Sequence, residues 1–226
     1  MSQAMTTSGK LTGQPIIFFG NERVATGVST DTPVLRALLK NGYKIAAIVA
    51  NYEQSKSRKS RDLEVAEVAK AYNIPLLLPD KLGDIRQQLH EYNAAIGVLI
   101  AYGKIIPESI INIFPHGIVN IHPSLLPFHR GPTPIEGVIL DGSTKTGVSL
   151  MQLVKAMDAG PVYAQSELTL NGTESKQLLA DKLTEIGCAM LIDILPGILV
   201  GDVIGVPQDA RVATYDALIH KEDGRL

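Results

Sequence analysis

The 226-residue sequence contains one cysteine, Cys188, so the chain cannot form an internal disulfide. A lone thiol is typical of a reducing compartment, and the simplest interpretation of Cys188 is a small buried apolar residue. The formal net charge is only -2, so any affinity for RNA must come from a local patch. No uninterrupted apolar run reaches the roughly 18–20 residues of a membrane span. We therefore expect a cytoplasmic protein with no membrane partner.

Two common ligand signatures are also missing. The five histidines show no His-x-x-Glu-His or similar spacing, so we predict no metal site. The segment from Gly20 to Gly27 lacks the Gly-x-Gly-x-x-Gly pattern, and we interpret it as a tight turn rather than as a dinucleotide site. Four histidines lie in contexts that favour solvation over catalysis: His90, His116, His129 and His220.

The sequence does contain a regular alternation of apolar runs and helical patterns. Residues 1–14 are polar and are expected to form a flexible tail. Residues 15–205 are expected to form one domain, and residues 206–226 a linker-like segment of short extended pieces. Strands separated by helices of this length predict an α/β fold, with an open, mostly parallel twisted sheet and helices on both faces.

The expected elements can be placed by residue number. Apolar runs predict strands at 15–19, 45–50, 74–78, 94–101 and 118–122, and extended segments at 146–154 and 162–170. Helical patterns cover 31–41, 62–72, 80–92 and 174–199, with Pro196 and Gly197 marking a candidate break in the last.

The most informative stretch runs from Val119 to Pro127. Asn120 and His122 are two residues apart on an apolar run, so in a strand their side chains leave on one face while Ile121 points into the core. Tyr102 and His122 both lie at the carboxyl ends of predicted strands. Ligands bind outside these ends in open parallel sheets, so the sequence predicts a site there.

Three other segments have both a structural and a functional interpretation. Gly103 would let the backbone approach a ligand, although a plain turn would look similar. Asp158 begins a sequence that is typical of turns, so it could be purely structural. Its carboxylate could also meet the amide of Asn120 and the imidazole of His122 in one site that needs no metal. The basic run is Lys56, Arg58, Lys59 and Arg61, which could bind phosphates or simply be solvated.

Taken together, these motifs resemble the folate-dependent formyltransferases. The resemblance rests on the Asn-x-His-x-Ser-Leu-Leu-Pro string that begins at Asn120, the following Arg130-Gly131 and the later Asp158. It implies a Rossmann-like formyltransferase fold, with a catalytic domain over residues 15–205. The segments beginning at Arg130, Thr146 and Ala213 are similar to the methionyl-tRNA branch of the family. That branch usually continues into a C-terminal barrel, which we expect to be absent here.

The resemblance also implies roles for particular residues. Asn120, His122 and Asp158 would be catalytic. A folate donor, 10-formyltetrahydrofolate, would contact Tyr102, Gly103, Ser124, Leu125, Leu126 and Pro127. Initiator methionyl-tRNA would contact the basic run (Lys56, Arg58, Lys59 and Arg61) and Arg130. No metal is required, and the protein is expected to be a monomer.

The expected reaction is acyl transfer to an amine. As a hypothesis, the Asn120 amide donates to the developing oxyanion, His122 polarises the formyl oxygen or relays a proton, and Asp158 orients His122 or a water. One alternative is a family member acting on a small amine, such as an amino sugar nucleotide or glycinamide ribonucleotide. A second alternative is a folate- or RNA-binding protein without catalysis.

Overall fold

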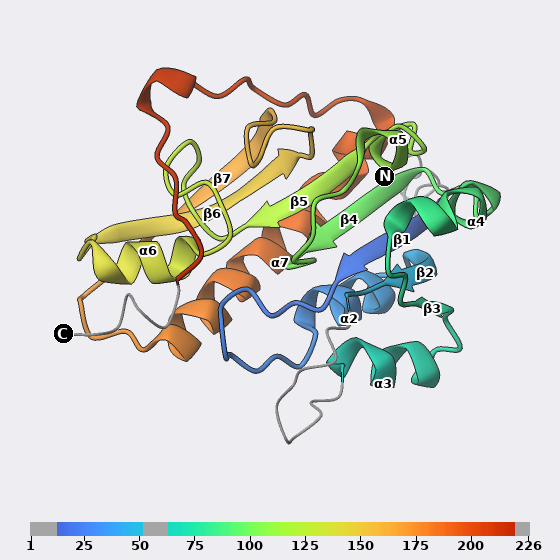
Figure 1. Cartoon of the computed structure of the whole chain (residues 1–226), viewed down its shortest axis with the longest axis horizontal. Helices are drawn as coiled ribbons and strands as arrows, with labels where there is room; N and C mark the ends of the chain where they lie inside the picture. Colours follow the sequence, from blue (N-terminus) through green and yellow to red (C-terminus); the bar gives the residue numbers. More distant parts are fainter. Residues whose placement is uncertain (1–12, 52–62, 220–226) are drawn as a thin grey trace, which may run out of the picture.

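A seven-stranded sheet forms the centre of the structure, a computed structural model that describes residues 13–51 and 63–219. Its strand order is β3-β2-β1-β4-β5-β6-β7 (Figure 1). The strands are β1 (Pro15–Gly20), β2 (Lys44–Val49), β3 (Leu76–Leu77), β4 (Ile96–Ile100), β5 (Ile118–His122), β6 (Lys145–Gln152) and β7 (Val162–Thr169). The first five pair in parallel and the last two pair antiparallel. The predicted open, mostly parallel sheet is confirmed.

The helices connect and cover these strands. They are α2 (Pro33–Lys40), α3 (Glu64–Ala71), α4 (Arg86–Glu91), α5 (Glu108–Ile111), α6 (Pro134–Leu140) and α7 (Lys176–Val200), with 3-10 turns η1 (Leu82–Ile85) and η2 (Ala210–Val212). The helix predicted over 80–92 is split into η1 and α4. The short helices α5 and α6 were not predicted, because four and seven residues give little room for a periodic pattern.

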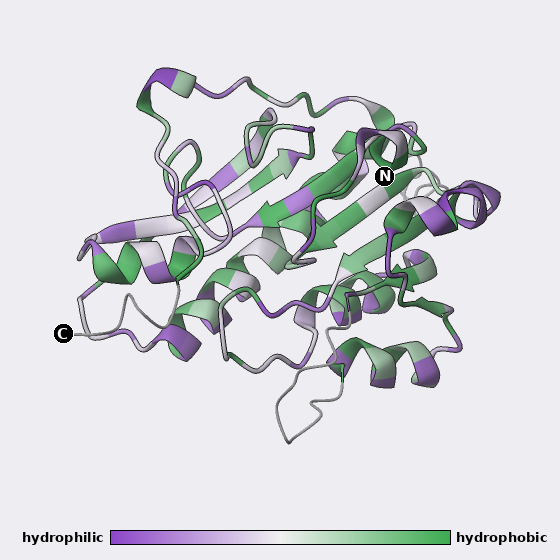
Figure 2. Cartoon of the chain, viewed as in Figure 1, coloured by the Kyte–Doolittle hydropathy of each residue, from purple (hydrophilic) through white to green (hydrophobic). Residues whose placement is uncertain are grey.

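Helices cover both faces of the sheet, as the alternation in β1 shows. Ile16 and Phe18 belong to a core that includes buried residues of α2, α3, α6 and α7. Ile17 and Phe19 belong to a second core with buried residues of η1, α4 and α5. Successive side chains of a strand point to opposite faces, so a strand buried on both sides reads as a continuous apolar run. Figure 2 shows this contrast between the green central strands and the purple outer faces of α3 and α4.

The longest helix, α7, runs through the predicted break without interruption. Pro196 lies inside it, and Leu195, Ile198 and Leu199 around the proline are buried, so packing holds the last turns together despite the missing N–H group. Ser175 caps the start by accepting a hydrogen bond from the backbone of Leu178 at 3.2 Å. By length and composition alone, α7 is the one helix in the described residues that could cross a membrane. Here it packs against α2 and the sheet as a core helix.

Candidate active site

A cavity of about 460 Å³ opens at the carboxyl edge of β4 and β5. Its walls come from the segment after β4, the end of β5, the loop that follows β5 and the connection between β6 and β7. Asn120, His122 and Asp158 all line it. The sequence placed a site at this edge because strand ends in an open parallel sheet leave a crevice there.

The end of β5 presents Asn120 and His122 to the cavity. Both side chains are buried, at 6% and 5% exposure, and they share one face of the strand. Val119 and Ile121 alternate with them and pack into the α7 side of the core. The predicted alternation in this strand is therefore confirmed.

The two ring nitrogens of His122 have different partners. Nε2 lies 2.9 Å from the backbone oxygen of His129. Because a carbonyl can only accept, Nε2 must carry a hydrogen in this arrangement. Nδ1 lies 3.8 Å from Oδ1 of Asp158. Nδ1 is thus the ring nitrogen without a backbone partner, and it faces the carboxylate of Asp158.

Asp158 reaches His122 by an indirect route. Strand β6 runs antiparallel to β5, so it ends with Gln152 opposite Val119, at the far end of β5 from His122. The connection of residues 153–161 must then return to place Asp158 beside the imidazole. Oδ2 of Asp158 accepts a hydrogen bond from the backbone N–H of Gly131 at 2.8 Å, which fixes the carboxylate against the loop after β5.

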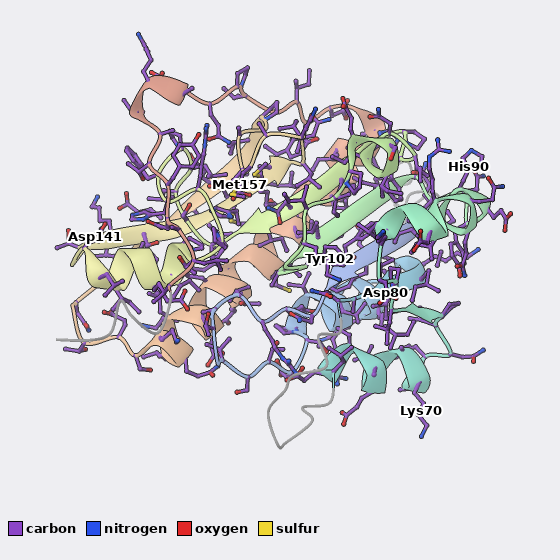
Figure 3. All side chains as sticks on the ribbon, viewed as in Figure 1. Lys70, Asp80, His90, Tyr102, Asp141 and Met157 are labelled. Atoms are coloured by element: carbon purple, nitrogen blue, oxygen red, sulfur yellow. The ribbon has the colours of Figure 1, made fainter. Side chains whose placement is uncertain are left out.

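Tyr102 and Gly103 form another wall of the cavity, as the sequence predicted for a ligand site (Figure 3 labels Tyr102 and Met157, which also lines the cavity). The Tyr102 ring packs edge-on against Phe19, with ring centroids 6.1 Å apart. Burial raises the pKa of Tyr102 to about 12, so its hydroxyl stays neutral. Gly20 nearby has no room for a side chain, because a Cβ atom would lie 1.8 Å from the carbonyl oxygen of Ile100.

The charge of the cavity wall is mostly positive. Among the described residues that line it, Arg23, Lys104 and Lys155 are positive and Asp158 supplies the one carboxylate. Arg23 lies in the loop after β1 and forms an ion pair with Glu64 at the start of α3. This wall suits a ligand that carries phosphate or carboxylate groups.

The loop of residues 124–127, predicted to contact a donor, does not line this cavity. The Ser124 hydroxyl donates to the backbone oxygen of Phe128 at 2.7 Å, and the Leu126 N–H donates to the Ser149 hydroxyl at 3.0 Å. These bonds turn the loop toward β6, and Leu125 lines a separate cavity. A donor role for Ser124, Leu125, Leu126 and Pro127 stays a prediction to which this geometry adds no support.

Arg130 is likewise not on the cavity wall. It is 2% exposed, and its guanidinium donates to Oε1 of Gln208 and to the hydroxyl of Tyr215. The basic run of Lys56, Arg58, Lys59 and Arg61 lies outside the described residues, as do residues 1–12 of the predicted tail. Glu64 just beyond the run pairs with Arg23, and Asn51 just before it lies beside Gly103.

Sequence reasoning missed several groups around the site. Arg23 was interpreted as part of a turn, although the loop after a buried parallel strand is where a site at that edge takes its residues. His129 was expected to be solvated, yet its ring lies between Asp216 and Asp141, with the nearer carboxylate at 2.9 Å. Within the described residues no group of three or more His, Cys, Asp or Glu side chains could hold a metal ion.

The family of the chain follows from comparison with known proteins. The family model described as Formyl transferase matches residues 22–195, so the chain belongs to the formyltransferase family of enzymes. The matched range includes Asn120, His122 and Asp158. The resemblance drawn from the sequence motifs is confirmed.

Curated relatives carry a more particular name. The chain is 38% identical over 215 residues to the methionyl-tRNA formyltransferase of Chloroflexus aurantiacus, covering 93% of this chain and 67% of that protein. It is 37% identical over 197 residues to the enzyme of that name from a Sulfurihydrogenibium species, covering 85% of this chain and 63% of the relative. The chain therefore spans about two thirds of the length of these relatives.

Solved structures share the fold at lower sequence identity. Glycinamide ribonucleotide transformylase 1 from Symbiobacterium toebii has a TM-score of 0.70 at 17% identity, over 88% of this chain and 95% of that one. An N-formyltransferase from Helicobacter canadensis, in complex with folinic acid and dTDP-3-aminofucose, also has a TM-score of 0.70, at 16% identity over 94% of this chain and 72% of that one. At such identities the likeness shows the Rossmann-like formyltransferase fold alone.

Proposed function

We propose that this protein transfers the formyl group of 10-formyltetrahydrofolate to the α-amino group of initiator methionyl-tRNA. The observation that carries the proposal is the convergence of the Asn120 amide, the His122 imidazole and the Asp158 carboxylate on one cavity with a positive wall. The curated relatives named methionyl-tRNA formyltransferase support the choice of acceptor.

The cavity wall fits a folate donor. The apolar side chains of Leu99, Ile106 and Leu153 offer contact for flat rings, and the backbone around Tyr102 and Gly103 offers polar groups for a pterin edge. Lys104 and Lys155 supply positive charge for glutamate carboxylates. The neighbour from Helicobacter canadensis holds folinic acid, a folate derivative, in the same fold.

Formyl transfer to an amine begins with attack of the neutral nitrogen on the formyl carbon. An α-amino group has an unperturbed pKa of about 7.7–8.0, so the site needs little help to obtain the neutral form. A carbon–nitrogen bond forms and a tetrahedral oxyanion develops. The bond from that carbon to the folate nitrogen then breaks, and the amine proton moves to the folate nitrogen. The products are the formylated amine and tetrahydrofolate.

Each catalytic group has one task in this scheme. The Asn120 amide donates a hydrogen bond to the oxyanion, and one such donor is typically worth about 3–4 kcal/mol. His122 takes the amine proton on Nδ1 and returns it to the leaving nitrogen, while its Nε2–H stays bonded to the His129 carbonyl. Asp158 stabilises the imidazolium that forms between these two steps.

Binding of the tRNA is proposed to involve the basic run. Lys56, Arg58, Lys59 and Arg61 are proposed to contact the tRNA backbone, because the flanking residues Asn51 and Glu64 lie beside the cavity residues Gly103 and Arg23. Phosphate contacts made by residues between these two flanking positions would hold the 3′ end of a tRNA near Asn120 and His122. A cytoplasmic location and a monomeric state are part of the same proposal, and sedimentation equilibrium would check the latter.

The test is a comparison of acceptors with the full chain. Formyl transfer from 10-formyltetrahydrofolate is measured with charged initiator methionyl-tRNA, glycinamide ribonucleotide and an amino sugar nucleotide in parallel. We expect transfer to the charged tRNA at a kcat/KM at least 100-fold above that for the small amines. Preference for a small amine would assign the chain to another branch of the family, and no transfer to any acceptor would favour a binding protein.

A further inference from the structure

The last described segment of the chain lies across the loops that hold the catalytic groups. This strap, residues 206–218, contains η2 and crosses the loop after β5 (the red segment that descends toward α6 in Figure 1). Arg130 and Tyr215 form a parallel backbone bridge. Near its end, Leu218 lines the active-site cavity. A segment that reads as a linker in the sequence is therefore joined to the site.

Gln208 of the strap contacts both loops with one amide group. Its Oε1 accepts hydrogen bonds from the Arg130 guanidinium, at 2.7 Å from Nη2 and 3.1 Å from Nε. Its Nε2 donates to the backbone oxygens of Asp158 at 2.8 Å and Gly160 at 2.7 Å. Both ends of the amide are thus used, one on the loop after β5 and one on the connection between β6 and β7.

These two loops carry the groups whose spacing matters for proton transfer. The loop after β5 supplies the His129 carbonyl that holds Nε2 of His122, and the Gly131 N–H that holds Asp158. The connection between β6 and β7 supplies Asp158, which enters from the far end of β5. His122 ends β5, but Asp158 lies in a connection and not at a strand end, so the distance between them depends on side-chain and backbone bonds between the loops.

The other end of the strap tightens the same loop. Asp216 accepts a hydrogen bond from Nδ1 of His129 at 2.9 Å, and its backbone N–H donates to the oxygen of Arg130 at 2.7 Å. Gly131 is packed so closely that a Cβ atom would lie 2.3 Å from the Asp216 oxygen. These contacts fix the positions of the His129 carbonyl and the Gly131 N–H. The first is the partner of His122, and the second is the partner of Asp158.

We propose that Gln208 is a positioning residue for the reaction, which clasps the two loops and so sets the approach of Asp158 to Nδ1 of His122. The proposal rests on the proposed formyl transfer but not on the identity of the acceptor. Gln208 does not line the cavity and contacts none of the proposed reacting groups. Its removal should therefore slow the chemical step and leave substrate binding unchanged. Small misplacements of catalytic groups can cost about 100-fold in rate.

Two variants of Gln208 separate the accepting oxygen of its amide from the donating nitrogen. Gln208→Glu keeps an oxygen that accepts from Arg130, but it has no N–H group to donate to the oxygens of Asp158 and Gly160. Gln208→Met keeps the length of the side chain and removes both the acceptor and the donor. We expect kcat to fall 10- to 100-fold in each, with KM for donor and acceptor within threefold of the wild type. The control is Arg211→Ala in the same strap, whose guanidinium is exposed and bonds only to Asp209 among the described residues.

A double-mutant cycle distinguishes positioning from a general structural role. If Gln208 acts through Asp158, adding Gln208→Glu to Asp158→Asn should lower kcat by less than twofold, because the group being positioned no longer functions. Wild-type transfer is measured first on the best acceptor, so failure of the proposed function appears there and not in the variants. The proposal is overturned if the losses multiply in the double variant. It is also overturned if Gln208→Glu keeps at least half of the wild-type kcat, or if both variants lose activity only by unfolding in thermal melts.

Discussion

The imidazole of His122 and the carboxylate of Asp158 approach to 3.8 Å although β6 leaves the sheet at the opposite end of β5. The contact is maintained by bonds to Gly131 and Gln208 rather than by the sheet itself. A separation of 3.8 Å leaves the pair short of a direct hydrogen bond. At this distance the carboxylate still acts on the ring electrostatically, which is the role that the proposed mechanism gives it.

Loss of the charge on Asp158 should slow the reaction without disturbing the loop. In Asp158→Asn the amide oxygen can still accept from the Gly131 N–H, but the imidazolium of His122 loses its counter-charge. We expect kcat to fall about 100-fold or more, within the range for general acid–base groups. Steady-state kinetics with thermal melts measure this. A kcat within fivefold of the wild type would remove Asp158 from the mechanism.

Removal of the Asn120 amide should act on the transition state alone. Asn120→Ala takes away a donor to a charge that develops only during attack, so we expect a loss of about 100- to 1000-fold in kcat with little change in KM. Asn120→Asp should be at least as damaging, since a carboxylate repels an oxyanion. Asn112→Ala, at the exposed end of α5, is the matched control. A rise in KM with unchanged kcat would contradict the assigned role.

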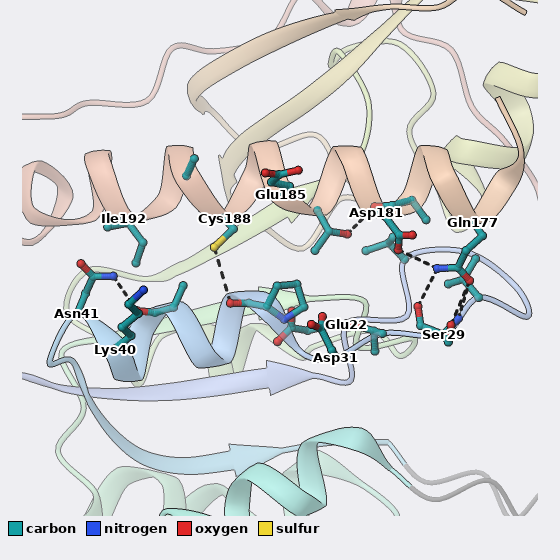
Figure 4. A pocket seen from close by; sticks show the side chains of 18 residues that line it. Glu22, Ser29, Asp31, Lys40, Asn41, Gln177, Asp181, Glu185, Cys188 and Ile192 are labelled. Carbon is teal, nitrogen blue, oxygen red and sulfur yellow. Dashed lines mark hydrogen bonds between the residues drawn. The ribbon is translucent and has the colours of Figure 1, made fainter. Parts of the chain in front are cut away.

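Glu22 makes the stability of the fold dependent on pH. Its side chain is 1% exposed and accepts hydrogen bonds from the N–H groups of Val34 and Leu35 at the start of α2. Figure 4 shows it beside Asp31, in the groove between α2 and α7. Burial raises its pKa from 4.5 to about 7, outweighing the two backbone bonds, which lower it.

The sign of this dependence follows from proton binding. Between pH 4.5 and 7 the folded state keeps the proton that the unfolded state has already lost, so stability falls as the pH rises and the loss is complete above about pH 7. The loss amounts to about 3 kcal/mol from this group. Denaturant unfolding of the wild type and Glu22→Gln at pH 4.5 and pH 8 measures it. The wild type should lose about 3 kcal/mol more than the variant, and equal losses would refute the assignment.

Neutralising the basic run should affect only the macromolecular acceptor. With Lys56, Arg58, Lys59 and Arg61 changed to Gln, we expect KM for charged tRNA to rise at least 10-fold. The salt dependence of that KM should also become shallower, because fewer phosphate contacts release fewer counterions. Transfer to a small amine should stay unchanged. The control is the pair Lys44→Gln and Lys70→Gln, two exposed lysines of β2 and α3. An equal effect in the control pair would point to overall charge instead.

Much of the site could be predicted from the sequence because it depends on local patterns. The period-two alternation around Ile121 decides which face Asn120 and His122 share, and a buried strand followed by Tyr102 and Gly103 decides where that wall of the cavity lies. The sheet was predictable for the same reason, since strands buried on both faces are continuous apolar runs.

The groups that sequence reasoning missed depend on contacts between distant segments. Gln208 meets Arg130 across 78 residues and Asp158 across 50, and no periodic pattern reports such pairings. The direction of the loop at Ser124 was missed for a similar reason, because it depends on Ser149 in β6. Pro196 shows the opposite case, where a strong local signal for a break is overridden by the packing of α7.

The two outer strands of the sheet have consequences for how this chain behaves at high concentration. β3 has only two residues, and β7 alternates exposed polar side chains while its first residue, Val162, exchanges backbone hydrogen bonds with Val206. Exposed strand edges recruit other chains into intermolecular sheets, and short or covered edges resist this. The segment that carries Gln208 thus also pairs with the first residue of the β7 edge, so at high concentration only the later part of β7 is open to another strand.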